Sequence, residues 1–421
     1  MKQIRRVAIL GSSRIPFARS NSAYVGKSNQ DMLTAAFRGV VDKFQLHGEE
    51  LGDVVAGAVI KHSRDFSLCR ESVLGSGLSP ATPAFDIQQA CGTGLEAAIV
   101  VANKIALGQI EVGMAGGVDT TSDAPIAVSE GLRKILLEAN RARDTKGKLA
   151  ALLKIRPKHL APLPPANGEP RTKMSMGQHC EVMAQTWGIT REAQDEFALN
   201  SHKKAIAAQQ AGEFTAEITP VTVSLAQPNL ATGEIVTKSK VVSLDEGARA
   251  DSSIEGLAKL KPVFAAKGSV TAGNSSQMSD GAGCLILASE AAVKQFNLVP
   301  LAKWRGFAVR GVPPEIMGIG PKEAIPAVLK TAGLNKNDID WFELNEAFAA
   351  QSLAVMKDLE LDPAKVNPMG GAIALGHPLG ATGAIRAATV VHALRRHNLK
   401  YGMVTMCIGT GMGAAGIFER V

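Results

Sequence analysis

"GTGLEAAIVVANKIALGQIEVGMAGG", residues 92–117, and "GAIRAATVVHALRRHNLKYGMVTMC", residues 383–407, share one pattern, a helix followed by a buried strand. From Gly94 in the first stretch and from Gly383 in the second, the next aligned glycine comes nineteen residues later, where the strand begins. Between the glycines, apolar residues recur at helical spacing. Repetition of such a unit within one chain predicts two similar halves of alternating helices and strands.

The segments upstream of these stretches repeat as well. "DMLTAAFRGVVDKFQLHGEELGDVVAGAV", residues 31–59, parallels "KEAIPAVLKTAGLNKNDIDWFELNEAF", residues 322–348, because each reads as an amphipathic helix, a polar turn and an apolar strand. Strands that alternate with helices favour mostly parallel sheets covered by helices. We therefore predict an α/β fold with an N-terminal half in residues 1–123, completed by about 262–290, and a C-terminal half in residues 291–421.

A different kind of sequence separates the halves, and we interpret residues 124–261 as an inserted loop domain. It holds the basic segment 132–160, a proline-rich turn and a helical stretch that begins after a Thr190 cap. The basic segment has nine Lys/Arg residues and two acidic residues. Its net charge of +7 equals that of the whole chain. Its apolar residues are spaced as in amphipathic helices, and such helices would bind a membrane surface or a partner subunit. These residues are Leu132, Ile135, Leu136, Leu149, Leu152 and Leu153. The alternative is a lid on the active site whose lysines stay solvated or steer an anionic cofactor.

Composition narrows the class of protein. The chain has 421 residues, 46% of them hydrophobic and 20% charged, which predicts at least two packed units and excludes disorder. Five cysteines without a CxxC pair argue against a disulfide framework or a metal cluster, so we expect a reducing, cytoplasmic setting. The N-terminal run VAIL is too short for a signal peptide, and no stretch approaches a membrane span. Without aromatic residues among the basic ones, a nucleic-acid partner is not expected.

Cys91 stands where a strand gives way to a helix, in "DIQQACGTGLEAAIVVANKI", residues 86–105. The unpaired N–H groups and the positive end of a helix dipole favour a thiolate at such a position. The alternative is a small buried cysteine that only packs.

His377 is the one ionisable residue in "GGAIALGHPLGATGA", residues 370–384. When the two repeats are aligned, His377 falls three residues from the place of Cys91, so a two-fold arrangement of the halves would bring both residues to the centre. The surrounding glycines would let the backbone and a bulky substrate approach the imidazole. The alternative is a loop histidine without a role.

Two further polar residues follow predicted strands. Cys407, in "VTMCIGTGMGAAGIF", residues 404–418, lies at a strand end that a ligand could reach. The glycines after it do not form a dinucleotide-binding loop, because only five residues remain after Gly416. Asn345, in "WFELNEAFAAQ", residues 341–351, also ends a strand and would serve equally as a helix cap.

Together, "QQACGTGLEAA", "NEAFAA", "GGAIALGHPLGATG" and "CIGTGMGAA" resemble the four motifs of the thiolase family, in the family's order and across the whole chain. The resemblance implies a thiolase-like fold with αβαβα layers. It also implies thiolysis of 3-ketoacyl-CoA or the reverse Claisen condensation, with coenzyme A as a substrate and no permanently bound cofactor. Decarboxylating condensing enzymes of the ketoacyl-synthase type are the alternative, but they lack a second cysteine.

The resemblance also implies a role for each residue. Cys91 would take the acyl group, His377 would be its base, and Cys407 would move the proton on the α-carbon. A water on Asn345 would help His377 to stabilise the enolate, and the N–H groups of Cys91 and Gly409 would hold the tetrahedral oxyanion.

For coenzyme A, the family pattern points to Arg249, Ala272, Ser276 and Phe348. Ser175 departs from this pattern, since many short-chain thiolases have a histidine there that contacts the cofactor. Met317 matches a methionine that limits chain length, which favours acetoacetyl-CoA, whereas the basic segment resembles the loop of β-oxidation complexes that handle longer chains. The family further implies a homodimer or homotetramer.

Overall fold

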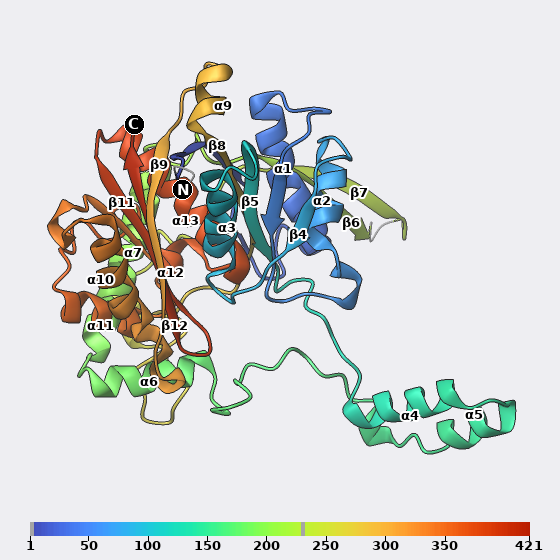
Figure 1. Ribbon diagram of the computed structural model, residues 1–421. Coiled ribbons are helices and arrows are strands. Elements are labelled where there is room, and N and C mark those ends of the chain that lie inside the picture. Colours follow the sequence, from blue (N-terminus) through green and yellow to red (C-terminus); the bar gives the residue numbers. More distant parts are fainter. Residues whose placement is uncertain (1–3, 229–231) are drawn as a thin grey trace.

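The computed structural model describes residues 4–228 and 232–421 of the chain (Figure 1). Among these residues, a ten-stranded sheet runs in the order β4-β3-β5-β8-β1-β9-β12-β11-β10, and the short β2 pairs with β8. The first half contributes β1 (Val7–Arg14), β2 (Ala18–Arg19), β3 (Asp53–Ala56), β4 (Ala84–Asp86), β5 (Val112–Asp119) and β8 (Ser279–Ser289). The second half contributes β9 (Ala302–Gly311), β10 (Trp341–Leu344), β11 (Tyr401–Ile408) and β12 (Met412–Arg420). The order β1-β8-β5-β3 recurs as β9-β12-β11-β10, which confirms the prediction of two similar halves.

The prediction of mostly parallel sheets is wrong. The parallel pairs are β3 with β4, β3 with β5, and β10 with β11, whereas β1, β8, β9 and β12 pair antiparallel with their neighbours. One reason lies in the connection between β11 and β12, which spans only Gly409 to Gly411. A parallel neighbour needs a crossover of a dozen or more residues, so this short loop can only give an antiparallel hairpin.

Helices cover both faces of the sheet and also lie between its two halves. On one side α1 (Asn29–Phe44) packs on β1, β5 and β8, with α2 (Leu68–Ser76) beside it. On the other side α10 (Gly320–Ala332) packs on β9, β11 and β12, with α11 (Ala349–Leu359) beside it. Between them α3 (Thr93–Ala106) and α13 (Leu379–Arg396) pack against each other and against strands of the sheet. The predicted αβαβα layering is therefore present.

The starts of α3 and α13 touch backbone to backbone. A Cβ atom on Gly94 would lie 2.7 Å from the backbone nitrogen of Ala384, and one on Gly383 would lie 2.3 Å from the backbone nitrogen of Leu95. Distances this short allow no side chain, so glycine is required at both places. The two glycines that align in the repeat thus face each other's helix in the fold.

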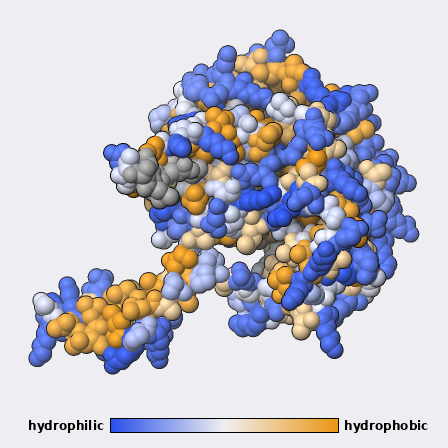
Figure 2. Space-filling model, turned by 180° about the vertical axis from the view of Figure 1, so that it is seen from behind, coloured by the Kyte–Doolittle hydropathy of each residue, from blue (hydrophilic) through white to orange (hydrophobic). Residues whose placement is uncertain are grey.

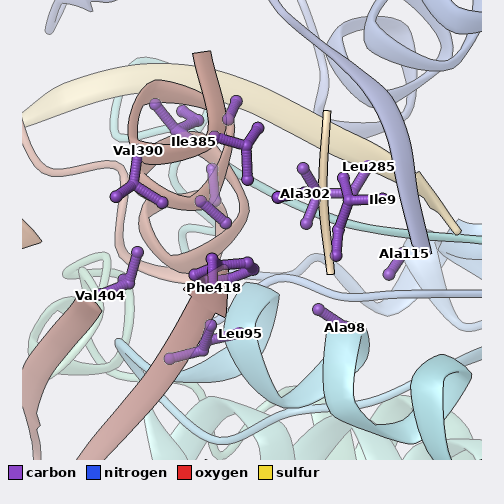
Figure 3. Packing of buried hydrophobic residues seen from close by; sticks show 14 of the residues in the cluster. Ile9, Leu95, Ala98, Ala115, Leu285, Ala302, Ile385, Val390, Val404 and Phe418 are labelled. Carbon is purple, nitrogen blue, oxygen red and sulfur yellow. The ribbon is translucent and has the colours of Figure 1, made fainter. Parts of the chain in front are cut away.

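Apolar residues of both halves fill the space around these helices (Figure 3). Leu95 and Ala98 of α3 meet Ile385 of α13 and Phe418 of β12 in one buried cluster. Burial of apolar area stabilises a fold by roughly 25 cal/mol per Å². Because residues of both halves are buried in this cluster, it holds the halves together.

The inserted residues between the halves form two unlike parts. Helices α6 (Met176–Thr186) and α7 (Arg191–Gln210) return to the body, where α6 packs on α11 and α7 on α11 and α12 (Ala372–Leu375). The Thr190 side chain accepts a hydrogen bond from the N–H of Ala193, which confirms the predicted cap of α7. The remaining elements are β6 (Val221–Pro228), β7 (Ile235–Val242), α8 (Ile254–Ala258) and, in the second half, α9 (Glu290–Gln295).

Helices α4 (Glu130–Arg141) and α5 (Thr145–Leu152) form a hairpin that extends away from the body (Figure 1). One side of the hairpin has a hydrophobic surface bordered by hydrophilic residues (Figure 2). The exposed fractions are 57% for Leu149, 69% for Leu153 and 64% for Leu160. Since the hairpin does not cover the body, the prediction of a lid is wrong.

Candidate active site

Cys91 sits in a tight turn between β4 and α3. Ala90 before it has a φ of 43°, in the left-handed region that costs a residue with a side chain about 1–2 kcal/mol. The turn is held by the N–H of Gln89, which donates to the Thr93 hydroxyl at 2.9 Å, and by that hydroxyl, which donates to the carbonyl of Ala90 at 2.7 Å. The nucleophile candidate is therefore presented on a strained, fixed turn.

The surroundings of Cys91 favour its thiol form. Burial raises its pKa to about 11, the N–H groups of Gly409 and of Cys91 itself lower it, and the charge of Asp119 raises it. This raised pKa opposes the thiolate that the helix start led us to expect, because the loss of solvation outweighs the N–H groups. A thiol of this kind needs a base before it can attack.

His377 is buried between α12 and α13 and has the properties of that base. Burial, followed by the charge of Arg386, lowers its pKa to about 3, so the imidazole is neutral at physiological pH. Its Nδ1 lies 2.6 Å from the hydroxyl of Thr382, and its Nε2 lies 3.4 Å from the amide nitrogen of Asn345. With that amide donating to Nε2, Nδ1 carries the proton and donates to Thr382. Nε2 then carries the lone pair, which can take a proton when the Asn345 amide releases its hydrogen bond.

Asn345 follows β10 and is 1% exposed. Its N–H donates to the carbonyl of Thr405 at 2.9 Å, which joins the ends of β10 and β11. Helix α11 is capped by Phe348 instead, so the interpretation of Asn345 as a cap is wrong. Its side-chain oxygen is buried and has no hydrogen-bond partner among the described residues. A ligand or a water is the natural partner for such an atom.

Cys407, on β11, lies close enough to Cys91 for their charges to interact. Burial raises the pKa of Cys407 well above its usual value, and the charges of Cys91 and Cys180 raise it further. Met317, in the short 3-10 helix Pro314–Ile319, and Phe348 pack in the same apolar cluster as Cys407. The structure thus gathers the second sulfur and two of the predicted substrate contacts.

Gly409 follows Cys407 by two residues, in the loop between β11 and β12. Its backbone N–H lowers the pKa of the Cys91 thiol, so it lies near that sulfur. A Cβ atom on Gly409 would meet nothing closer than the sulfur of Met176 at 3.5 Å, so the protein's own packing does not require glycine here.

Arg249 and Ala272 line one pocket of about 320 Å³, together with His202 and Gln277. The carbonyl of Gln277 accepts the N–H of His377 at 3.4 Å, so this pocket adjoins the imidazole. Ser276 lies next along the chain, and its N–H donates to the carbonyl of Ala347 at 2.9 Å. Arg249 and Ala272 thus share one pocket, and Phe348 packs in the apolar cluster that also holds Cys407.

Sequence reasoning missed Thr382, His202 and Asp119. The buried Asp119 carboxylate accepts the N–H groups of Ile60 at 2.8 Å and Gly380 at 2.6 Å, and burial raises its pKa to about 6. Asp119 thereby ties the start of α13 to the first half. Thr382 could have been found from its place on the first turn after the histidine, but no local pattern indicated the other two.

Within residues 4–228 and 232–421, no group of three or more His, Cys, Asp or Glu side chains is arranged to hold a metal ion. None of the helices in these ranges is long and apolar enough to cross a membrane.

Comparison with known proteins gives the family. Residues 7–291 match the model of the thiolase N-terminal domain, and residues 298–420 match that of the thiolase C-terminal domain. The chain belongs to the thiolase family. It is thus an acyltransferase, and the ketoacyl-synthase alternative is not favoured.

Individual thiolases resemble the chain along nearly its full length. The peroxisomal 3-ketoacyl-CoA thiolase A of Mus musculus is 40% identical over 98% of this chain and 90% of its own. The 3-ketoacyl-CoA thiolase of Bacillus subtilis is 38% identical over 99% of this chain and 100% of its own. Among solved structures, the Bacillus anthracis acetyl-CoA acetyltransferase has a TM-score of 0.90 at 33% identity and covers both chains fully. Human mitochondrial 3-ketoacyl-CoA thiolase in complex with CoA has a TM-score of 0.86 at 35% identity and covers 99% of this chain and 98% of its own.

Proposed function

We propose that this thiolase cleaves 3-ketoacyl-CoA with coenzyme A, giving acetyl-CoA and a shortened acyl-CoA, and catalyses the reverse condensation of two acetyl-CoA. Three observations support the proposal: the Asn345 amide nitrogen lies 3.4 Å from Nε2 of His377, the charge of Cys91 acts on Cys407, and the helices that begin after Cys91 and His377 touch at their starts. A neutral buried imidazole such as that of His377 is suited to general-base activation of a thiol nucleophile. Coenzyme A enters this scheme as a substrate, with no permanently bound cofactor.

In the cleavage direction, Nε2 of His377 takes the thiol proton as the Cys91 sulfur attacks the C3 ketone. The N–H groups of Cys91 and Gly409 hold the resulting oxyanion. When the intermediate collapses, the C2–C3 bond breaks and its electron pair forms the enolate of acetyl-CoA, which the Cys407 thiol protonates at carbon.

The Cys91 thioester is then attacked by the thiol of coenzyme A. That thiol gives its proton to the Cys407 thiolate, and the imidazolium of His377 returns a proton to the departing Cys91 sulfur. The enolate oxygen of the first stage would be held by His377 and by a water on Asn345. The unpartnered side-chain oxygen of Asn345 supports this role.

The cysteine assignments are tested by the variants Cys91→Ala and Cys407→Ala in a thiolysis assay. Both are expected to lose turnover, but Cys91→Ala alone should lose covalent acylation as measured by intact mass. Full turnover in either variant would refute the assignment.

For substrate binding, we propose that Arg249, Ala272, Ser276 and Phe348 contact coenzyme A and that Met317 restricts the acyl chain. The pocket lined by Arg249 and Ala272 supports the first part, and the burial of Met317 beside Cys407 supports the second. On this basis acetoacetyl-CoA is a substrate. Turnover of a series from four to sixteen carbons is the test, and a preference for long chains would argue against the role of Met317.

We propose that the α4–α5 hairpin, within residues 132–160, binds an anionic membrane surface. Its exposed leucines and its Lys/Arg excess are the combination that binds such interfaces. Sedimentation with anionic phospholipid vesicles should pull down the intact protein but not a Leu149→Ser, Leu153→Ser variant. Equal sedimentation of both would refute this role, and a partner subunit of β-oxidation would then be the other occupant to test.

We also propose a homodimer or homotetramer in the cytoplasm, without a nucleic-acid partner. Strand β4 ends the sheet, and Phe85 on it is 39% exposed, which is a surface suited to a second copy. Light scattering at micromolar concentration tests the assembly, and a monomer would contradict it. Fractionation of cells that express the tagged chain tests the location.

A further inference from the structure

Glu169 connects the inserted residues to the loop that carries Gly409. It is only 7% exposed, and one oxygen of its carboxylate accepts the backbone N–H of Thr410 at 2.5 Å. Thr410 follows Gly409 directly and has a φ of 71°, in the left-handed region. A residue with a side chain pays roughly 1–2 kcal/mol for that conformation, so another contact must hold it in place. The hydrogen bond that the Thr410 N–H donates to the Glu169 carboxylate is such a contact.

The carboxylate is itself firmly placed. The N–H of Glu169 donates to the carbonyl of Met174 at 2.9 Å, and the N–H of Lys173 donates to the carbonyl of Glu169 at 2.9 Å. This turn leads into α6, which is capped by the Ser175 side chain. Glu169 therefore stands on a closed turn at the start of a packed helix, although it belongs to the segment that returns from the projecting hairpin.

Glu169 also borders the open side of Gly409. A Cβ atom on Gly409 would lie 3.9 Å from the Glu169 carboxylate and 3.5 Å from the Met176 sulfur. A negative charge so close to a developing oxyanion is unfavourable electrostatically. Charge therefore does not explain why a carboxylate occupies this place, whereas its acceptor oxygen does.

We propose that Glu169 is a positioning residue, which fixes the Gly409–Thr410 peptide and thereby aims the Gly409 N–H at the oxyanion formed on Cys91. The inference rests on the proposed function, since it assumes that Cys91 is acylated. Only the acceptor oxygen is needed for this role. Glutamine at position 169 keeps such an oxygen, whereas alanine removes it and aspartate withdraws it by one methylene.

The experiment follows the acylation of Cys91 by acetyl-CoA, with rapid quenching and intact-mass detection. Glu169→Ala and Glu169→Asp should acylate about ten to a hundred times more slowly than the wild type, because a misplaced oxyanion donor loses much of its effect. Their final extent of acylation should stay unchanged, since it reports the correctly folded fraction. Glu169→Gln should keep the wild-type rate, as should the control Glu50→Ala, which removes an exposed carboxylate elsewhere.

The same measurement can overturn the inference. A wild-type acylation rate in Glu169→Ala would do so, and so would an equal loss in Glu169→Gln. A reduced extent at an unchanged rate would assign Glu169 to folding stability alone. If the wild-type protein shows no acylation of Cys91, the proposed function fails, and this inference fails with it.

Discussion

Replacement of Thr382 by valine tests how the candidate base is held. The Thr382 hydroxyl lies 2.6 Å from Nδ1 of His377, and the two residues are only 1% and 7% exposed. When Nε2 takes the thiol proton, the imidazole becomes a cation, and its hydrogen bond to Thr382 becomes charge-assisted. Such a bond contributes about 1.5–3 kcal/mol, which corresponds to a rate factor of about 10 to 150. Valine has nearly the same shape as threonine but accepts no hydrogen bond.

We therefore expect Thr382→Val to lower kcat for thiolysis of acetoacetyl-CoA by about 10 to 150 times, with KM nearly unchanged. Thr382→Ser keeps the hydroxyl and should stay close to the wild type. The assay is the loss of 3-ketoacyl-CoA absorbance, with thermal unfolding as the check on folding. Wild-type kcat in Thr382→Val would refute the reasoning, as would the same loss in Thr382→Ser.

Two further predictions concern stability. Gly383→Ala would place a Cβ atom 2.3 Å from the backbone nitrogen of Leu95, so we expect a loss of about 1–3 kcal/mol in the free energy of unfolding, whereas Gly26→Ala, which has open space, should be nearly neutral. Burial lowers the pKa of His392 from 6.5 to about 3, with a further lowering by nearby Lys and Arg charges. As pH falls from 6.5 toward 3, the unfolded chain takes up a proton there and the folded one does not, so stability is lost by up to about 1.4 kcal/mol per pH unit. In denaturant unfolding at pH 6 and pH 5, His392→Gln should lose less stability than the wild type, and parallel losses would contradict this.

The two-half architecture could be predicted because both halves repeat the same local sequence pattern of a helix followed by a strand. Gly94 and Gly383 align in sequence, and each faces the backbone of the other's helix in the fold. The same alignment puts Cys91 and His377 just before those two helices, whose starts touch in the fold. The exact ends of the halves and of the loop domain remain a prediction.

The features that could not be predicted from the sequence depend on contacts between segments that are distant along the chain. The pKa of Cys91 is governed by burial that the whole fold produces, so the local argument from the helix start gave the wrong protonation state. Glu169 meets Thr410 across 241 positions of sequence, and Asp119 meets Gly380 across 261. Neither pair leaves a periodic or compositional signal. The prediction of mostly parallel strands relied on the alternation of helices and strands. It left out the short loop after Cys407, which allows only an antiparallel pair.

The contact between the starts of α3 and α13 bears on whether either half could exist alone. The start of each helix packs directly against the start of the other, so closely that even a methyl group does not fit between them. If one half were separated from the other, it would expose apolar surface and the polar backbone of a helix end. We therefore expect that a chimera made from this chain and a relative would stay folded only where both donors keep a bare backbone at that crossing. A duplicated ancestor would have met the same demand as soon as its two copies fused.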